Sequence, residues 1–139
     1  NMNTQGKQVI VFLCVENSCR SQIAEAFGKM VDQDAYEIKS AGSSPFGKVD
    51  SRAINVMSEL GYDLSSHSST SVNELAGEEI ALVVSMGCGD ACPNLSAKKR
   101  IDWEVADPKR MSLEDFRRIR DLIKVKVETL FVDIDREMK

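Results

Sequence analysis

The stretch from Val9 to Ser21 constrains the fold more strongly than any other part of this chain. It opens with a continuous apolar run over residues 9–13, passes through Cys14 and a short polar loop, and reaches Arg20 where a helical pattern begins. An unbroken apolar run of this length is typical of a strand buried on both faces of a parallel sheet. The stretch therefore predicts a strand, a tight loop and a helix N-terminus in succession.

The loop between Cys14 and Arg20 has the composition of an anion-binding site. Backbone N–H groups curled before a helix point into one concavity, and the helix N-terminus adds roughly half a positive charge. The Arg20 guanidinium suits two oxygens of a tetrahedral anion, and the same field favours a Cys14 thiolate. Asn17 tolerates a left-handed turn and can brace the loop. The candidate oxyanion-binding residues are Val15, Glu16, Asn17, Ser18, Cys19, Arg20 and Ser21.

The composition of the chain limits which kinds of partner it can bind and in which cellular compartment it is expected. The chain has 139 residues, 42% of them hydrophobic and 29% charged, which predicts a single domain over residues 1–139. A formal charge of −4 argues against a nucleic-acid partner, because such proteins need a basic face. No apolar run approaches the roughly 20 residues of a membrane span, and no signal peptide is recognised. We therefore expect a cytoplasmic protein, and a monomer, with no membrane partner.

Strand and helix patterns alternate along the chain. Strands are predicted over residues 8–13, 36–41, 80–84 and 101–105, and helices over residues 21–31, 50–60, 72–76 and 113–136. This alternation predicts a three-layer α/β/α fold around a four-stranded parallel sheet. Ligands bind beyond the carboxyl ends of the strands in such sheets. Cys14, Cys88 and Asp107 all follow predicted strands, so we expect them to converge.

The four cysteines fall into two pairs, and each pair allows more than one interpretation. A structural disulfide framework is not expected in the cytoplasm. Cys88, flanked by glycines, and Cys92 can form a thiol relay to Cys14, or they can be two ordinary cysteines. Zinc is disfavoured, because neither C-x4-C nor C-x3-C is the usual C-x2-C spacing. Cys14 itself could be a buried structural thiol, and Cys19 either packs in the loop or forms a protective disulfide with Cys14.

Three further residues could have either a catalytic or a purely structural role. Asp107, which Pro108 follows, is a candidate general acid, with a simple loop turn as the alternative. His67, the single histidine, lies in a serine-rich loop, where surface exposure or local hydrogen bonding is favoured over catalysis. Trp103 is expected to pack in the core or against a loop.

Residues 14–25, CVENSCRSQIAE, closely resemble the signature of the thioredoxin-coupled arsenate reductases, which share the low-molecular-weight protein tyrosine phosphatase fold. The likeness continues through residues 40–42, the loop of residues 63–69, the Cys88 and Cys92 segment, and Asp107-Pro108. The resemblance implies a cytoplasmic enzyme of arsenical resistance that acts on arsenate, with phosphate or sulfate as analogues.

The resemblance also implies a mechanism. Cys14 attacks arsenate, helped by Arg20 and by Asp107 as acid. Cys88 then attacks Cys14 and releases arsenite, and Cys92 moves the disulfide to Cys88–Cys92, where thioredoxin can reduce it. The short spacing of this pair resembles a variant branch, some of whose members use a glutaredoxin-type partner or a small thiol. The donor is therefore thioredoxin or another thiol.

The resemblance also includes residues that bind a potassium ion in some members of the family. No tightly bound cofactor is expected, but Asn17, Glu25 and Ser40 match a potassium site of some members. Thr70 stands where an acid would help that site. Glu16 stands where phosphatases of this fold usually have glycine, which brings a negative charge close to the oxyanion-binding loop.

Two other functions compete with arsenate reduction. A tyrosine phosphatase of this fold needs only Cys14, Arg20 and Asp107. Such phosphatases usually carry tyrosines just after Asp-Pro, whereas residues 109–111 here are Lys-Arg-Met. This difference and the second cysteine pair favour the reductase, with possible residual phosphatase activity. A non-enzymatic oxyanion-binding or redox-sensing module is the least favoured.

Overall fold

Four parallel strands form the sheet of the computed structural model, which describes residues 6–32, 34–87 and 95–137. The strands are β1 (Gln8–Cys14), β2 (Tyr36–Gly42), β3 (Leu82–Met86) and β4 (Lys99–Trp103). The α-helices are α1 (Arg20–Val31), α2 (Ser51–Ser58) and α3 (Leu113–Glu137), and short 3-10 helices include η2 (Leu64–Ser66), η3 (Val72–Leu75) and η5 (Pro108–Arg110).

The strand order is β2-β1-β3-β4, and every neighbouring pair is parallel. Strand β1 therefore lies inside the sheet, with β2 on one side and β3 on the other. The chain leaves β1 toward β2 through α1 and later returns to the opposite side of β1 through β3. Such a reversal of direction opens a crevice at the carboxyl end of the strand. The loop after Cys14 lies at this point.

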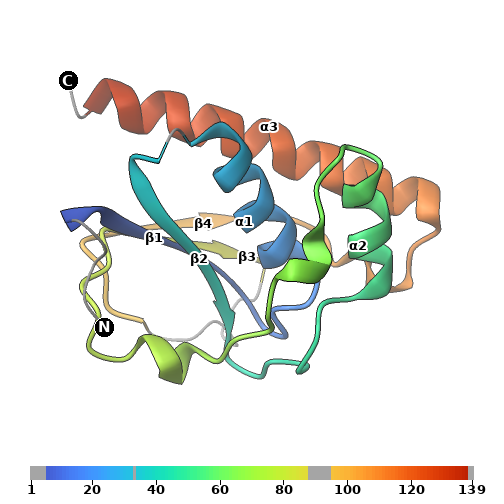
Figure 1. Ribbon diagram of the computed structural model, residues 1–139, viewed down its shortest axis with the longest axis horizontal. Coiled ribbons are helices and arrows are strands. Elements are labelled where there is room, and N and C mark those ends of the chain that lie inside the picture. The colour runs from blue at the N-terminus through green and yellow to red at the C-terminus, as the bar shows by residue number, and fades with distance from the viewer. Residues whose placement is uncertain (1–5, 33, 88–94, 138–139) are drawn as a thin grey trace.

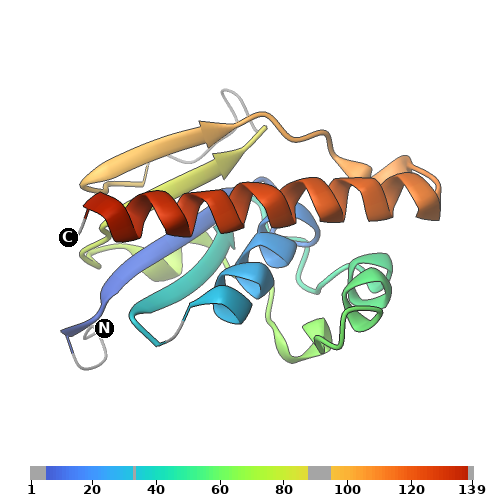
Figure 2. The ribbon, with the colours of Figure 1, turned by 90° about the horizontal axis from the view of Figure 1, so that it is seen from above.

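The three helices cover one face of the sheet, as Figures 1 and 2 show from two directions. Alternate residues of a strand point to opposite faces, so Ile10 and Phe12 of β1 face the helices. They pack with Ile23 and Phe27 of α1 and with residues of α2 and α3, including Met57 and Ile123, and all six are almost completely buried.

A second, smaller core lies on the other face. Val9, Val11 and Leu13 of β1 pack there against Leu75 of η3 and against Ile80. Leu95 and Ala97 add to this cluster. The outer layer on this face, within the described residues, is thus a 3-10 helix and irregular chain rather than a long helix.

The α/β class and the four-stranded parallel sheet are confirmed. The third and fourth strands each differ from the prediction by about two residues: β3 runs over Leu82–Met86 and β4 over Lys99–Trp103. Ile80 and Val105 are buried outside the strands, so their apolar character reflects core packing and not strand structure. The prediction that they belong to strands is wrong. The predicted helix over residues 72–76 is the short η3, begun by a capping box between Ser71 and Glu74. Every helix among the described residues is too short or too polar to cross a bilayer.

Candidate active site

Cys14 ends β1 and is 3% exposed, at the floor of the crevice. Its sulfur lies 2.9 Å from the hydroxyl oxygen of Ser21, in the first turn of α1. Ser21 is itself fully buried. A hydroxyl at this distance can donate a hydrogen bond to a thiolate.

The carbonyl groups of the loop after Cys14 bond to the segment that follows β2. Ser44 N donates to Val15 O at 2.9 Å, Phe46 N to Glu16 O at 2.8 Å, and Asp50 N to Ser18 O at 3.0 Å. In the part of the chain that the structure describes, no protein acceptor bonds the backbone N–H groups of residues 16–19. The loop thus has satisfied carbonyls and available N–H groups, which is the arrangement of an anion-binding nest.

Asn17 holds the loop in shape. Its backbone adopts a left-handed φ of 50°, and its side chain is completely buried. The amide nitrogen donates to Ser21 Oγ at 2.7 Å and to Ser40 Oγ at 2.9 Å, while the amide oxygen accepts from Thr70 N at 2.7 Å. The predicted left-handed turn and bracing role of Asn17 are both present.

Gly42, the last residue of β2, lets the loop approach the sheet. A Cβ atom at this position would overlap Val15 O and would lie 2.9 Å from Asn17 N and 3.0 Å from Cys14 O. All three neighbours are backbone atoms of the loop, so they have no rotamer by which to move away. The small residue at the end of β2 is therefore required by the loop after β1.

Helix α1 presents an N-terminus without a side-chain cap to the same cavity. Its N-cap residue, Cys19, makes no capping hydrogen bond with its side chain, and the first turn contains no acidic residue. A helix N-terminus without its own cap leaves N–H groups for a ligand and favours negative charge. The local geometry thus suits an oxyanion placed above Cys14.

Arg20 is held by two distant carbonyl groups, one at the end of β3 and one after β4. Its Nη1 donates to Met86 O at 2.9 Å and to Val105 O at 3.0 Å. Gly87, with φ of 68°, passes so close that a Cβ atom there would lie 2.9 Å from Nη1. These contacts fix the plane of the guanidinium, and within residues 6–32, 34–87 and 95–137 its other nitrogens have no backbone acceptor.

Asp107 lines the same cavity as the loop and comes from a distant part of the chain. Its Oδ2 is 3.8 Å from Nη2 of Arg20, its Oδ1 accepts from Lys109 N at 3.1 Å, and its side chain is 53% exposed. Pro108 begins η5 directly after it, and its ring restrains the backbone there. A half-exposed carboxyl group beside the cradle can exchange protons with solvent and with a leaving oxygen.

These groups surround one cavity of about 220 Å³. Its lining residues are Cys14, Val15, Glu16, Ser18, Cys19, Arg20 and Asp107. The structure thus brings Asp107 together with Cys14 and Arg20, which lie at the two ends of one loop. Cys88 and Cys92 lie outside the described residues, so their convergence with Cys14 stays a prediction.

Cys19 differs from Cys14 in its surroundings. It is 4% exposed and packs in the larger core cluster, which supports the packing interpretation of this residue. Burial, together with the negative charge of Asp50, raises the pKa of its thiol to about 12. Cys19 is therefore a neutral thiol at physiological pH and a poor nucleophile.

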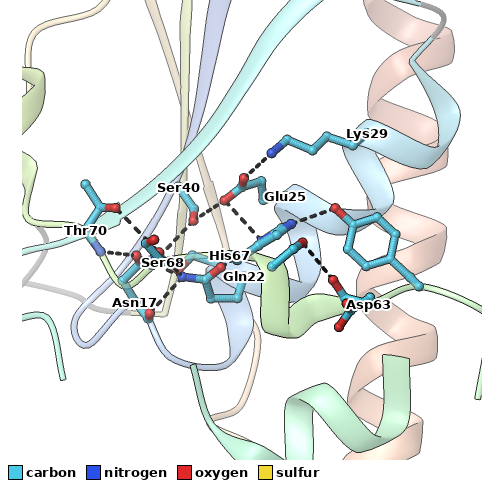
Figure 3. A network of polar contacts seen from close by, with 12 residues as sticks. Asn17, Gln22, Glu25, Lys29, Ser40, Asp63, His67, Ser68 and Thr70 are labelled. Carbon is cyan, nitrogen blue, oxygen red and sulfur yellow. Dashed lines mark hydrogen bonds and ion pairs between the residues drawn. The ribbon is translucent and has the colours of Figure 1, made fainter. Parts of the chain in front are cut away.

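A buried polar network behind the loop extends to His67 (Figure 3). The His67 ring bonds Tyr62 OH at 2.6 Å through Nε2 and Gln22 Oε1 at 2.9 Å through Nδ1. Gln22 Nε2 then donates to both oxygens of Asn17 at 3.0 Å. The His67 side chain is only 4% exposed, so the predicted surface position of His67 is wrong. The alternative prediction, local hydrogen bonding, is confirmed by the bond to Tyr62.

The role of Gln22 and Tyr62 was missed in the sequence. Gln22 follows the loop signature directly, at the helical position where a long amide can turn back toward Asn17. Tyr62 lies five residues before His67, a spacing that carries no recognisable pattern. Burial lowers the pKa of His67, an effect that the nearby Glu25 carboxylate opposes.

The residues matched to a potassium site already satisfy one another. Ser40 Oγ donates to Glu25 Oε1 at 2.5 Å, and Asn17 turns its amide nitrogen, a donor, toward Ser40. The Lys29 ammonium lies 2.6 Å from Glu25 Oε2 and balances its charge. A potassium ion needs several oxygen atoms directed at one point, so this donor set does not fit it. Among the described residues, no group of three or more His, Cys, Asp or Glu side chains could hold a metal ion.

This arrangement is typical of enzymes that attack tetrahedral oxyanions with a cysteine. The cysteine lies at the end of a strand, the loop supplies N–H groups, and an arginine at a helix N-terminus and an aspartate complete the site. Residues 9–139 match the family described as low molecular weight phosphotyrosine protein phosphatase, and the chain belongs to that family. The resemblance noted in the sequence is thereby confirmed.

The more similar relatives within this fold are arsenate reductases. The arsenate reductase of Staphylococcus aureus (strain Newman) is 38% identical over 126 residues, which cover 88% of this chain and 95% of the relative. A solved structure described as an arsenate reductase in the phosphate binding state has 34% identity and a TM-score of 0.82, covering 91% of this chain and 98% of its own. The thioredoxin-dependent arsenate reductase of Corynebacterium glutamicum has 27% identity and a TM-score of 0.79, covering 96% of this chain and 65% of its own.

Proposed function

We propose that this protein reduces arsenate to arsenite, with Cys14 as the nucleophile. The observation that carries the proposal is the cavity of about 220 Å³ that joins Cys14, Arg20 and Asp107. Its size and its N–H groups suit a free tetrahedral oxyanion. The relatives named arsenate reductase support the same substrate.

The first step is attack on arsenic. The loop N–H groups and the Arg20 guanidinium hold three oxygens of arsenate, and the Cys14 thiolate forms a sulfur–arsenic bond. One oxygen leaves as water after Asp107 donates a proton to it. The charge that builds up on the remaining oxygens is stabilised by donors already in place, which is the main source of rate enhancement at such sites.

The second step is the reduction. The Cys88 thiolate attacks the sulfur of Cys14, a disulfide forms, and the sulfur–arsenic bond breaks with its electron pair remaining on arsenic. Arsenic is thereby reduced from As(V) to As(III), and the two thiols are oxidised. Cys92 then attacks Cys88, which frees Cys14 and leaves a Cys88–Cys92 disulfide.

A dithiol protein such as thioredoxin would reduce the final disulfide and complete the cycle. The thioredoxin-dependent neighbour supports this class of donor.

Hydrolysis of phosphate monoesters is the second candidate function. It needs Cys14, Arg20 and Asp107 but no second thiol, and the family as a whole is described as a phosphatase family. The Lys-Arg-Met sequence at residues 109–111 supplies no aromatic side chain to flank a phosphotyrosine. We therefore propose hydrolysis as a residual activity.

Two assays on wild type, Cys14→Ser and Cys88→Ser test the proposal. Arsenate reduction is followed by NADPH consumption with thioredoxin and its reductase, and hydrolysis is followed with p-nitrophenyl phosphate. Cys14→Ser should lose both activities. Cys88→Ser should lose arsenate turnover while keeping most of the hydrolysis. Full arsenate turnover by Cys88→Ser would contradict the relay, and replacing thioredoxin with glutaredoxin or a small thiol would identify the donor.

A further inference from the structure

An ion pair lies beside the Cys14 cavity, which Glu16 helps to line. Lys109 Nζ lies 2.6 Å from Glu16 Oε1, and these two residues are 93 positions apart in the sequence. Glu16 belongs to the oxyanion loop and lines the cavity, while Lys109 lies two residues after Asp107, which also lines it. The pair therefore links the oxyanion loop to the segment that carries Asp107.

Both ends of the bridge are anchored. The Lys109 ammonium lies 4.9 Å from the centre of the Phe46 ring, within the range of a cation–π contact. The Glu16 carbonyl accepts from Phe46 N at 2.8 Å, and Lys109 N donates to the Asp107 carboxylate at 3.1 Å. Glu16, Phe46 and Lys109 thus form one assembly, whereas an ordinary surface ion pair depends on two long side chains alone.

We propose that the Glu16–Lys109 bridge selects substrates by size, admitting free tetrahedral oxyanions and excluding phosphate esters with bulky leaving groups. The inference rests on the proposed oxyanion chemistry at Cys14. In that chemistry the leaving group departs toward Asp107, the group that protonates it. An aryl group on that side meets the bridge, whereas the oxygen that arsenate loses does not.

The size of the cavity agrees with this selection. At about 220 Å³ it is smaller than the roughly 300–1,000 Å³ of pockets that hold drug-sized ligands. Its lining contains no aromatic side chain among the described residues. An aryl ester would have to separate Glu16 from Lys109 to enter.

The bridge also solves a problem of charge. A lone Glu16 carboxylate at the mouth would repel an entering anion. The Lys109 ammonium neutralises it, and its hydrogen bond to Glu16 raises the pKa of Lys109, so the ammonium persists. Because the pair is neutral overall, removing both side chains changes the opening without changing the net charge.

The test compares wild type with the double variant Glu16→Ala/Lys109→Ala. We measure kcat/KM for p-nitrophenyl phosphate and the competitive inhibition constant of inorganic phosphate in the same assay. The ratio of the ester kcat/KM to the phosphate affinity should rise about tenfold, on the combined scale of an exposed ion pair and a cation–π contact. The matched control is Glu114→Ala/Arg118→Ala, which removes an exposed ion pair of α3 and should leave both values unchanged.

A measurement on the wild-type protein avoids any question of folding. Raising the salt concentration weakens exposed ion pairs. The ratio of ester turnover to phosphate affinity should therefore rise with salt in wild type and stay flat in the double variant. An unchanged ratio in the double variant, or equal salt dependence in both proteins, would overturn the bridge as a selector. The proposed function fails separately, through retained activity of Cys14→Ser.

Discussion

The hydroxyl oxygen of Ser21 lies 2.9 Å from the sulfur of Cys14 and 2.7 Å from the amide nitrogen of Asn17. Asn17 donates to this oxygen, so the hydroxyl hydrogen is left to point toward the sulfur. Ser21 is thus oriented as a donor to a Cys14 thiolate, and the orientation is imposed from behind the loop.

Ser21→Ala should slow the alkylation of Cys14 by iodoacetamide at pH 7 by about tenfold or more, since hydrogen bonds to charged groups contribute about 1.5–3 kcal/mol. Arsenate turnover should fall with it. Peptide mapping by mass spectrometry measures labelling of Cys14 alone. Ser58→Ala, which removes an exposed hydroxyl of α2 that donates to Asn55 O, is the control. Equal labelling rates in wild type and Ser21→Ala would contradict the role of this hydroxyl.

Gly42→Ala should damage the cradle more than the sheet. The added methyl group would meet Val15 O and Asn17 N, both backbone atoms of the loop. We expect phosphate affinity and arsenate turnover to fall by about tenfold or more, with a loss of stability of about 1–3 kcal/mol. Gly47→Ala is a useful comparison, since open space surrounds that position and only its φ of 100° opposes a side chain. If the Gly42→Ala protein bound phosphate as tightly as wild type, the loop backbone would have to shift to accommodate the methyl group, which would contradict this prediction.

Stability should fall as the pH drops below about 6.5, and His67 should cause part of this loss. Burial lowers the pKa of His67, so the folded protein keeps the ring neutral where the unfolded chain takes up a proton. The stabilisation is complete above the unfolded pKa and is lost toward the lower, folded one. Melting temperatures at pH 7.5 and 5.5 measure the effect. His67→Gln should show the smaller drop, and an equal drop in both proteins would exclude His67 as the cause.

Cys19 should resist alkylation in the folded protein. With a pKa raised to about 12, only about one thiol in ten thousand is ionised at pH 8, whereas an ordinary cysteine with a pKa near 8.5 is ionised to roughly a quarter. Peptide mapping after iodoacetamide treatment should find Cys19 unlabelled until the protein is denatured. Labelling of Cys19 in the native state as fast as in denaturant would contradict its burial.

Much of the fold and part of the site follow from local patterns. The apolar run before Cys14 and the helical period after Arg20 are properties of neighbouring residues, so the strand, the loop and the helix were predicted close to their observed bounds. The bounds of β3 and β4 were less accurate, because Ile80 and Val105 are apolar for packing outside the strands. Periodicity does not distinguish the two causes.

The sequence alone determined the candidate nucleophile, its loop and the alternation of strands and helices, because each depends on residues adjacent in the chain. The tertiary structure decided what surrounds Cys14 from a distance: the carbonyl of Val105 on Arg20, and the Lys109 ammonium over Glu16. These contacts join residues more than eighty positions apart. They depend on which strand ends meet at one edge of the sheet, and the strand order that brings them together exists only once the chain has folded.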